Sequence, residues 1–395
     1  MPPSPEHIAA AQRAFALYQQ GRFQQALELA ETLLTLSPPQ PSLLNLAAVC
    51  ARPLGLADKA EAYLRSAIRI DPGHANAHGN LGLVLQDAGR LVEAESAFQR
   101  ALELSPDDMA GMINLGNLYR ATQRPAQAEA AFRKVLARTP ENINALYNLG
   151  LLLSGSGRAD EAEAVFRKSL KIRPDQADVY NDLGNVLMDR LRLDEAEQAY
   201  RKAIALWPGY VDAHFNLATL LMECRRMEEA WSLLQRCLHL QPDHANALNA
   251  MGNLLSQAGR REEAEKAYRH SLKIRPDSAN IHGNLGNLLM EFNRFPEAEA
   301  EFRQAVALEP TYAYALGQAA SCARQLLAWS HAASDEASII SSIERGVSGI
   351  PSRIVMSLPS ASAQLQLQAA LLASQDKIRP FLDKPPIFSP ASHPH

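Results

Sequence analysis

Nine prolines in this chain recur at one constant interval, and no insertion or deletion interrupts the series. They are Pro38, Pro72, Pro106, Pro140, Pro174, Pro208, Pro242, Pro276 and Pro310. A regular period indicates stacked copies of one small structure, and a period of about 34 residues is typical of a helix–turn–helix repeat. The prolines therefore predict a solenoid, which needs no central core and can grow to this length as one domain.

Alignment on the prolines divides residues 7–312 into nine repeats. They begin at His7, Pro41, Ala75, Met109, Ile143, Ala177, Val211, Ala245 and Ala279. Position twenty is always alanine: Ala26, Ala60, Ala94, Ala128, Ala162, Ala196, Ala230, Ala264 and Ala298. Position eight is always small: Ala14, Ala48, Gly82, Gly116, Gly150, Gly184, Ala218, Gly252 and Gly286. Small residues at both positions allow two helices to approach closely. Position twenty-four is usually large, as at Phe98 and Leu234, and we expect it to fill the space between repeats.

Within a repeat, the apolar spacing predicts two helices. In Ala245–Gln257 the apolar residues recur at i, i+3, i+4 and i+7, which is helical spacing. Gly259-Arg260 then interrupts the helix, and Arg261–Ile274 is predicted to form the second one. The proline at the end of each repeat disfavours helical backbone in the preceding residue, so the second helix ends there.

This pattern of small residues, alanine, aromatic residue and proline resembles the tetratricopeptide repeat (TPR) family. The resemblance covers residues 7–312 and implies an all-α fold. In it, antiparallel helix pairs stack into a right-handed superhelix, and the first helix of each pair lines a concave groove. Arg13 replaces an apolar residue in the first repeat, as expected where one face of a terminal repeat meets water. Residues 1–6 are predicted to form a short tail.

After Pro310 the period fails. Residues 314–329 still read as a first helix, and a second helical stretch runs to about Arg345. We therefore predict that residues 313–346 form a capping pair of helices. Residues 347–395 are predicted to form a junction segment, with a helix at 362–375 and a disordered proline-rich end at 380–386.

The segment after Pro310 also resembles the junction in O-GlcNAc transferase-like proteins of the SPINDLY type, where a TPR region passes into a glycosyltransferase. The residues that carry this resemblance are Cys322, Trp329, Ile350-Pro351, Leu358-Pro359 and the run 364–370. The chain has no glycine-rich loop after a strand and no alternation of strands and helices. The resemblance therefore implies no catalytic residue in this chain.

Composition narrows the function further. The chain has 395 residues, of which 47% are hydrophobic and 21% charged, as in a soluble globular protein. The net charge is −4, and positive and negative residues are interspersed along the predicted helices. The chain therefore lacks the basic patch that a nucleic-acid-binding protein needs. No apolar run is long enough to span a membrane. The N-terminus has no basic stretch followed by an apolar one, so we expect no secretory signal and a cytoplasmic location.

Cysteine and histidine do not suggest a metal site or a cofactor. Cys50, Cys224, Cys237 and Cys322 form no CxxC pair, and we expect buried, reduced thiols. His74 and His78 are four residues apart, but no carboxylate or cysteine cluster joins them to complete a metal site. We therefore expect His78 to be a part-buried structural residue of its repeat and not a metal ligand.

Asparagine recurs at two positions of the first helix. Position six holds Asn80, Asn114, Asn148, Asp182, Asn216, Ala250 and Asn284 in repeats three to nine, and position nine adds Asn117, Asn185, Asn253 and Asn287. Positions three apart lie on one helical face, so the stack presents parallel rows of amides. The resemblance places these rows in the groove.

Two explanations fit these rows. Each amide both donates and accepts hydrogen bonds, so a row of amides can bind an extended peptide backbone and largely ignore its sequence. Alternatively, the asparagines make hydrogen bonds between repeats. Positions two and five carry no basic residue in repeats two to nine, so capture of a carboxylate by charge-assisted hydrogen bonds is not expected.

Three functional hypotheses follow. The first is a non-enzymatic scaffold that binds an extended peptide or a partner protein through the asparagine rows. The second is a truncated or split O-GlcNAc transferase-like protein, of which this chain is the substrate-recruiting half. The third is an assembly scaffold that uses the convex face. We expect no catalysis by this chain alone.

Overall fold

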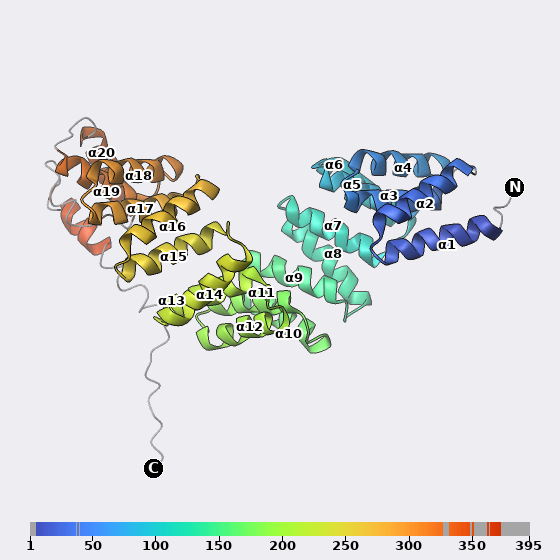
Figure 1. The fold of residues 1–395 in the computed structure, drawn as a ribbon, viewed down its shortest axis with the longest axis horizontal. Helices are drawn as coiled ribbons and strands as arrows, with labels where there is room; N and C mark the ends of the chain where they lie inside the picture. The colour runs from blue at the N-terminus through green and yellow to red at the C-terminus, as the bar shows by residue number, and fades with distance from the viewer. Residues whose placement is uncertain are drawn as a thin grey trace, which may run out of the picture. The chain divides into compact units, whose positions relative to one another are not determined.

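Each repeat folds into two antiparallel helices joined by a short turn (Figure 1). The computed structural model describes residues 5–36, 38, 40–326, 332–347, 350, 362 and 364–372. Every regular element in this part of the chain is a helix, which confirms the all-α fold. The helices divide into two bodies, Met1–Pro208 and Gly209–His395, hereafter the N-terminal and C-terminal bodies.

The N-terminal body contains the first six repeats, coloured blue to green in Figure 1. The first helices of these repeats are α1 (Pro5–Gln19), α3 (Pro41–Ala51), α5 (Ala75–Asp87), α7 (Met109–Ala121), α9 (Ile143–Gly155) and α11 (Ala177–Asp189). The second helices are α2 (Phe23–Leu36), α4 (Ala57–Ile70), α6 (Leu91–Leu104), α8 (Pro125–Arg138), α10 (Ala159–Ile172) and α12 (Leu193–Leu206). A short 3-10 helix, η1 (Arg52–Leu54), follows α3.

The C-terminal body contains the last three repeats. Their first helices are α13 (Val211–Glu223), α15 (Ala245–Gln257) and α17 (Ala279–Glu291), and their second helices are α14 (Met227–Leu240), α16 (Arg261–Ile274) and α18 (Phe295–Leu308). The bounds of α15 and α16 are those that the sequence predicts. Two further helices follow the ninth repeat: α19 (Ala313–Gln325) and α20 (Ala332–Glu344).

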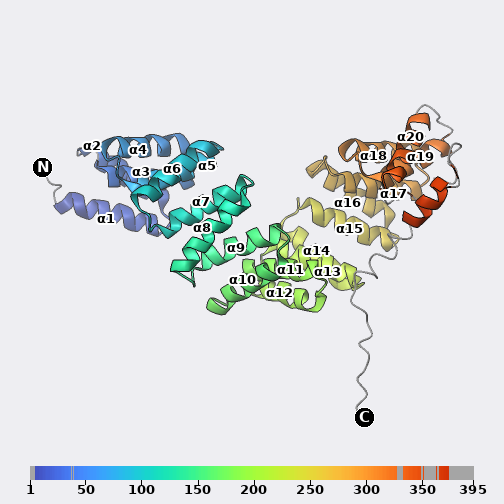
Figure 2. The ribbon, with the colours of Figure 1, turned by 180° about the vertical axis from the view of Figure 1, so that it is seen from behind.

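A last helix, residues 364–372, packs beside α19 and α20, and Figure 2 shows it in red next to them. Its Leu365 and Ala369 join a buried apolar cluster with α19 and α20. The other buried members of this cluster are Ala313, Leu316, Ala320, Ile339, Ile343 and Ile350. The cluster covers the apolar side of α19 that no tenth repeat covers. The predicted disordered end at 380–386 and most of the junction segment lie outside the described residues.

Helix pairs are held together by small residues opposite large ones. The alanine at position twenty is fully buried in all nine repeats. A Cβ added to Gly116 would lie 2.6 Å from the ring of Phe132, and one on Gly184 would lie 2.5 Å from the ring of Tyr200. The aromatic ring therefore lies against the glycine of its own repeat. Where position eight is alanine, in repeats one, two and seven, position twenty-four is alanine or leucine instead.

The turn between the two helices uses left-handed backbone at position fifteen in every repeat. Five repeats have glycine there, such as Gly157 with φ of 72°, and this residue adopts positive φ without steric cost. The other four repeats have Gln123, Leu191, Arg225 and Asn293, with φ between 57° and 62°. Left-handed backbone costs a residue with a side chain roughly 1–2 kcal/mol. The left-handed turn that glycine favours therefore also forms in the four repeats that have no glycine at this position.

The arginine after this turn connects successive repeats. Arg158 donates to Glu129 of the preceding repeat at 2.7 Å and to Glu161 of its own repeat at 2.6 Å. Equivalent inter-repeat ion pairs are Arg90–Glu61, Arg124–Glu95, Arg192–Glu163 and Arg294–Glu265. Arg260 instead lies over the ring of Trp231, 5.3 Å from its centroid, because tryptophan replaces the glutamate of repeat seven. A planar guanidinium bound at two points fixes relative orientation as well as adding energy.

The cysteines depart from the prediction at one site. Cys50, Cys237 and Cys322 are buried, and burial raises the pKa of each thiol to about 11. The prediction of a buried thiol is wrong for Cys224, which is exposed. This residue is the C-cap of α13 and directly follows the last helical residue, Glu223.

Candidate peptide-binding surface

The asparagines predicted at position six lie on the first helices and are all part-buried. Asn80, Asp182 and Asn284 of this row each make a hydrogen bond to position five of the preceding repeat. Asn80 donates to Asn45 at 2.7 Å, Asn284 donates to Asn249 at 3.0 Å, and Asp182 accepts from the hydroxyl of Tyr147 at 2.9 Å. At these sites the amide row therefore joins neighbouring repeats.

Asn148 and Asn114, two other members of the same row, have no such link. Asn148 donates to the backbone oxygen of Asn144, four residues earlier, at 2.9 Å. Asn114 on α7 makes no side-chain hydrogen bond to any residue in the described part of the chain. Asn216 lies part-buried on α13. The row is thus not uniform, and Asn114 keeps its amide available for a ligand.

The asparagines at position nine accept hydrogen bonds from tyrosines. Tyr200 donates to Asn185 at 2.8 Å and Tyr268 donates to Asn253 at 2.7 Å, each from position twenty-four of the same repeat. Asn287 accepts from Tyr314 of α19 at 2.8 Å. Burial raises the pKa of Tyr268, which keeps its hydroxyl protonated and able to donate.

Asn117 is the exception in this row. Its Oδ1 is buried and has no hydrogen-bond partner among the described residues. The reason lies at position twenty-four of the same repeat, where Phe132 replaces the tyrosine and has no hydroxyl to donate. The amide of Asn114 and the NH₂ group of Asn117 therefore lack a hydrogen-bond partner among the described residues, and the two residues are three apart on α7.

A pocket of about 560 Å³ opens on the first helices of the C-terminal body. Four of its lining residues are asparagines: Asn246, Asn249 and Asn253 on α15 and Asn280 on α17. Phe215 and Met222 of α13 and Ala250 of α15 form an apolar part of its wall. Only Asn253 was predicted as a site residue. The others repeat at positions two and five, as Asn76, Asn144 and Asn45 also do, and this recurrence could have revealed them.

The side-chain oxygens of three of these asparagines already accept hydrogen bonds from the protein. Asn246 accepts from Nη1 of Arg275 at 3.0 Å, Asn249 from Asn284 at 3.0 Å, and Asn253 from Tyr268 at 2.7 Å. Arginine can only donate, so the orientation of the Asn246 amide is fixed. The NH₂ groups of Asn246, Asn249 and Asn253 have no protein partner within the described residues.

The remaining polar groups of the pocket carry opposite charges. Glu223 lies at the end of α13 and Arg225 in the turn after it, and both line the pocket. Neither side chain has an ion-pair partner in the part of the chain that the structure describes. The two formal charges cancel, so the pocket has donors without a net charge.

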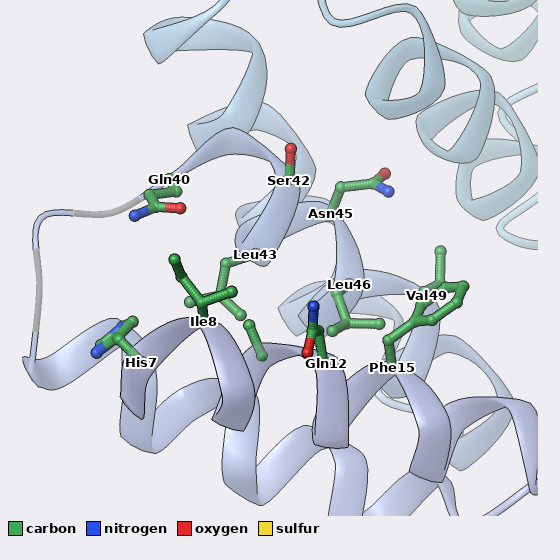
Figure 3. Close-up of a pocket in the computed structure, with 11 residues that line it drawn as sticks. His7, Ile8, Gln12, Phe15, Gln40, Ser42, Leu43, Asn45, Leu46 and Val49 are labelled. Atoms are coloured by element: carbon green, nitrogen blue, oxygen red, sulfur yellow. The ribbon is translucent and has the colours of Figure 1, made fainter. Parts of the chain in front are cut away.

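A second pocket, of about 530 Å³, lies between α1 and α3 in the N-terminal body (Figure 3). Figure 3 shows Ile8 and Phe15 of α1 facing Leu43, Leu46 and Val49 of α3. Ile8 is 47% exposed and Phe15 50% exposed, unlike most apolar residues of the chain. Amides and a hydroxyl border this pocket: Gln12, Gln40, Asn45 and Ser42. It is the more apolar of the two pockets.

The two pockets share one register. Both are lined mainly by positions two, five, six and nine of first helices, such as Ile8 and Phe15 in one and Asn246 and Asn253 in the other. We call the residues at these four positions of all repeats the first-helix surface. The predicted asparagine rows belong to it.

No metal centre emerges from the described residues, where no three His, Cys, Asp or Glu side chains gather as ligands. Nδ1 of His74 accepts from the backbone N–H of Ala77 and caps α5, and Nε2 of His78 lies 3.0 Å from the backbone oxygen of Pro72. Both histidines thus have structural partners. No helix of the described chain is long and apolar enough to cross a membrane.

Comparison with known proteins agrees with this geometry. Models of the tetratricopeptide repeat match residues 7–32, 39–107, 73–141, 113–177, 187–254, 226–288 and 255–322. Together these matches span most of the chain and nearly all of the nine repeats. No curated protein matches the sequence.

Several solved structures are similar. A tetratricopeptide repeat protein from Parabacteroides merdae is 21% identical over 63% of this chain and 98% of its own, with a TM-score of 0.52. PilF of Pseudomonas aeruginosa is 23% identical over 49% of this chain and 88% of its own, with a TM-score of 0.46. YrrB, a TPR protein with an unusual peptide-binding site, is 24% identical over 47% of this chain and 96% of its own, with a TM-score of 0.39. By its repeats, its helix pairs and the matching models of the repeat, the chain belongs to the tetratricopeptide repeat family.

Proposed function

We propose that this chain is a scaffold that binds an extended peptide, or an extended segment of a partner protein, along its first-helix surface. Proteins of the TPR family generally mediate protein–protein interaction. The observation that carries the proposal is the shared register of the two pockets. The same four positions line a pocket between α1 and α3 and another on α13, α15 and α17.

The surface offers two kinds of contact. Apolar residues such as Ile8, Phe15 and Phe215 would hold apolar side chains of the bound segment, and their burial would supply most of the binding energy. Amides such as Asn114 and Asn117 would bind its backbone. An extended chain has unsatisfied N–H and C=O groups, so a surface of amides suits it better than it suits a folded, helical partner.

The O-GlcNAc transferase-like alternative would use the same surface to recruit protein substrates. No feature of the described residues favours it over the scaffold, and the family matches are to TPR repeats alone. Its characteristic residues Trp329 and Leu358-Pro359 lie outside the described residues. We therefore propose binding without linked chemistry.

The experiment is a selection of random 12-residue peptides displayed on phage against the full chain. Selected peptides are then measured by fluorescence anisotropy against a variant with Asn114→Ala, Asn117→Ala and Asn148→Ala. Loss of up to three hydrogen bonds of about 1 kcal/mol each predicts roughly 10- to 100-fold weaker binding of at least one peptide class. The matched control is Gln127→Ala with Gln198→Ala, which removes two exposed amides from α8 and α12. Equal affinity for wild type and both variants would contradict a role for the asparagine rows.

A further inference from the structure

The pocket of the C-terminal body has a hydrogen-bonding polarity that the asparagine rows alone do not reveal. An isolated asparagine amide donates and accepts equally well. In Asn246, Asn249 and Asn253 the oxygen is turned to a protein donor: to Arg275, Asn284 and Tyr268 respectively. The group that each one leaves for a ligand is its NH₂.

We infer that this pocket selects hydrogen-bond acceptors, so that it binds carbonyl or carboxylate oxygens of a peptide and makes little use of its N–H groups. The inference rests on the proposed function and adds the chemistry of the ligand to it. Three NH₂ groups come from positions two, five and nine of α15, and Asn280 and Arg225, which also line the pocket, add further donors.

The acceptors available to a ligand N–H are few. Among the lining residues, Glu223 is the one carboxylate, and Asn280 adds one amide oxygen. The hydroxyl of Thr219 donates to the backbone oxygen of Phe215 at 3.1 Å, so it offers its oxygen, but no hydrogen, to a ligand. Each NH₂ group has two hydrogens, so donors outnumber acceptors in this pocket.

The charges favour backbone carbonyls as the source of these oxygens. Glu223 and Arg225 both line the pocket, and their formal charges cancel. A carboxylate would gain from Arg225 and lose through Glu223, whereas an uncharged carbonyl is indifferent to both. The apolar wall of Phe215, Met222 and Ala250 would then hold a neighbouring apolar side chain of the same peptide.

One double substitution removes a donor from the pocket and is expected to keep the fold, because other repeats of the chain already contain the resulting pair of residues. Asn253→Leu combined with Tyr268→Phe recreates the pairs Leu83/Phe98 and Leu151/Phe166, which occupy the same two positions in repeats three and five. The control is Gln127→Ala with Gln198→Ala, which changes two exposed amides on α8 and α12, outside the first-helix surface. Circular dichroism would establish that both variants keep their helices.

The test uses peptides selected from a random 12-residue phage library against the full chain. We expect one class of peptides to bind the Asn253→Leu/Tyr268→Phe variant about five- to tenfold more weakly, the effect of one lost hydrogen bond. The same class should bind the control variant with unchanged affinity. If peptides bind the chain but none is weakened by the pocket variant, the inference is overturned while the proposed function stands. If no peptide binds the chain, both fail.

Thioamide substitution along a pocket-dependent peptide tests the polarity. Sulfur in place of a carbonyl oxygen is a weaker acceptor, and it makes the attached N–H a stronger donor. We expect at least one thioamide to weaken binding about fivefold. Weakening by alanine at an Asp or Glu of the peptide, with no effect of any thioamide, would identify a carboxylate as the source of the bound oxygen and still support the inference. Thioamides that leave binding unchanged or strengthen it, in a peptide equally insensitive to alanine at its acidic residues, would overturn it.

Discussion

A Cβ added to Gly82 would lie 2.6 Å from the ring of Phe98, closer than real Cβ contacts allow. Gly82→Ala is therefore expected to lower the free energy of unfolding by about 1–3 kcal/mol through overpacking, partly offset by the better helix propensity of alanine. Adding Phe98→Leu recreates the pairs Ala48/Leu64 and Ala218/Leu234 of two other repeats. Urea denaturation of both single variants and the double variant should give a coupling energy of about 1 kcal/mol. Additive effects would show that the two residues do not constrain each other.

The buried Oδ1 of Asn117 lacks a donor because Phe132 has no hydroxyl. Phe132→Tyr should supply the kind of hydrogen bond that Tyr200 makes to Asn185. A hydrogen bond to this oxygen should stabilise the chain by about 1 kcal/mol. Thermal or urea unfolding measures the gain. Repeating the exchange in an Asn117→Leu background is the control, where the benefit should disappear. An equal gain in that background would assign the effect to something other than this bond.

Leu191 has left-handed backbone with φ of 57° and a side chain that is 54% exposed. Leu191→Gly removes the steric cost of this conformation and gives up little packing, so we expect about 1 kcal/mol of added stability. Gly157→Leu, at the same position of the preceding repeat, should have the opposite sign. The free energy of unfolding of each variant tests these two signs. A loss of stability in Leu191→Gly would mean that the side chain of Leu191 contributes more stability than its left-handed backbone costs.

Two histidines of the C-terminal body should titrate on opposite sides of the ordinary histidine pKa of about 6.5. The carboxylate of Glu301, 2.6 Å from Nδ1, raises the pKa of His282, whose Nε2 lies 3.0 Å from the backbone oxygen of Pro276. Burial lowers the pKa of His244, whose Nδ1 accepts from the N–H of Ala247 as a helix cap. An NMR titration of the imidazole signals measures both values directly.

The direction of each pKa shift determines how that histidine changes the stability of the chain with pH. The contribution of His282 is fully present below the ordinary histidine pKa and is lost as the pH rises through its raised folded-state pKa. The contribution of His244 is present above the ordinary histidine pKa and is lost as the pH falls through its lowered folded-state pKa. His282→Gln should therefore flatten the decline of stability on the alkaline side alone. A decline of the same size in this variant would mean that another group causes it.

Much of the fold could be predicted from the sequence because the regular period fixes each helix pair independently. The bounds of α15 and α16 follow from apolar spacing, a turn dipeptide and the terminal proline, all of which are local signals. The prediction for Cys224 is wrong because the exposure of this residue depends on where α13 ends. The last helix, residues 364–372, lies within the predicted helix at 362–375, but its packing on α19 and α20 depends on contacts distant in sequence.

The candidate site was less predictable because its chemistry depends on pairs of residues in different helices. The sequence showed that asparagines recur at positions six and nine. It did not show that the side-chain oxygen of Asn249 accepts a hydrogen bond from Asn284, 35 residues later, or that the oxygen of Asn253 accepts one from Tyr268. The sequence-based prediction uses positions two and five only to look for positive charge, and so it does not include Asn246, Asn249 and Asn280. The direction of a hydrogen bond becomes visible only when both partners are placed.

The central claim, that an extended peptide lies on the first-helix surface, is tested most directly by the side-chain NH₂ signals of the chain labelled with ¹⁵N-asparagine. A peptide selected against the full chain is added, and the signals are assigned by single substitutions. We predict that Asn114 and Asn117, or Asn246, Asn249 and Asn253, shift on binding, while Asn293 in the turn before α18 does not. Binding that shifts Asn293 but leaves the first-helix asparagines unchanged would contradict the account.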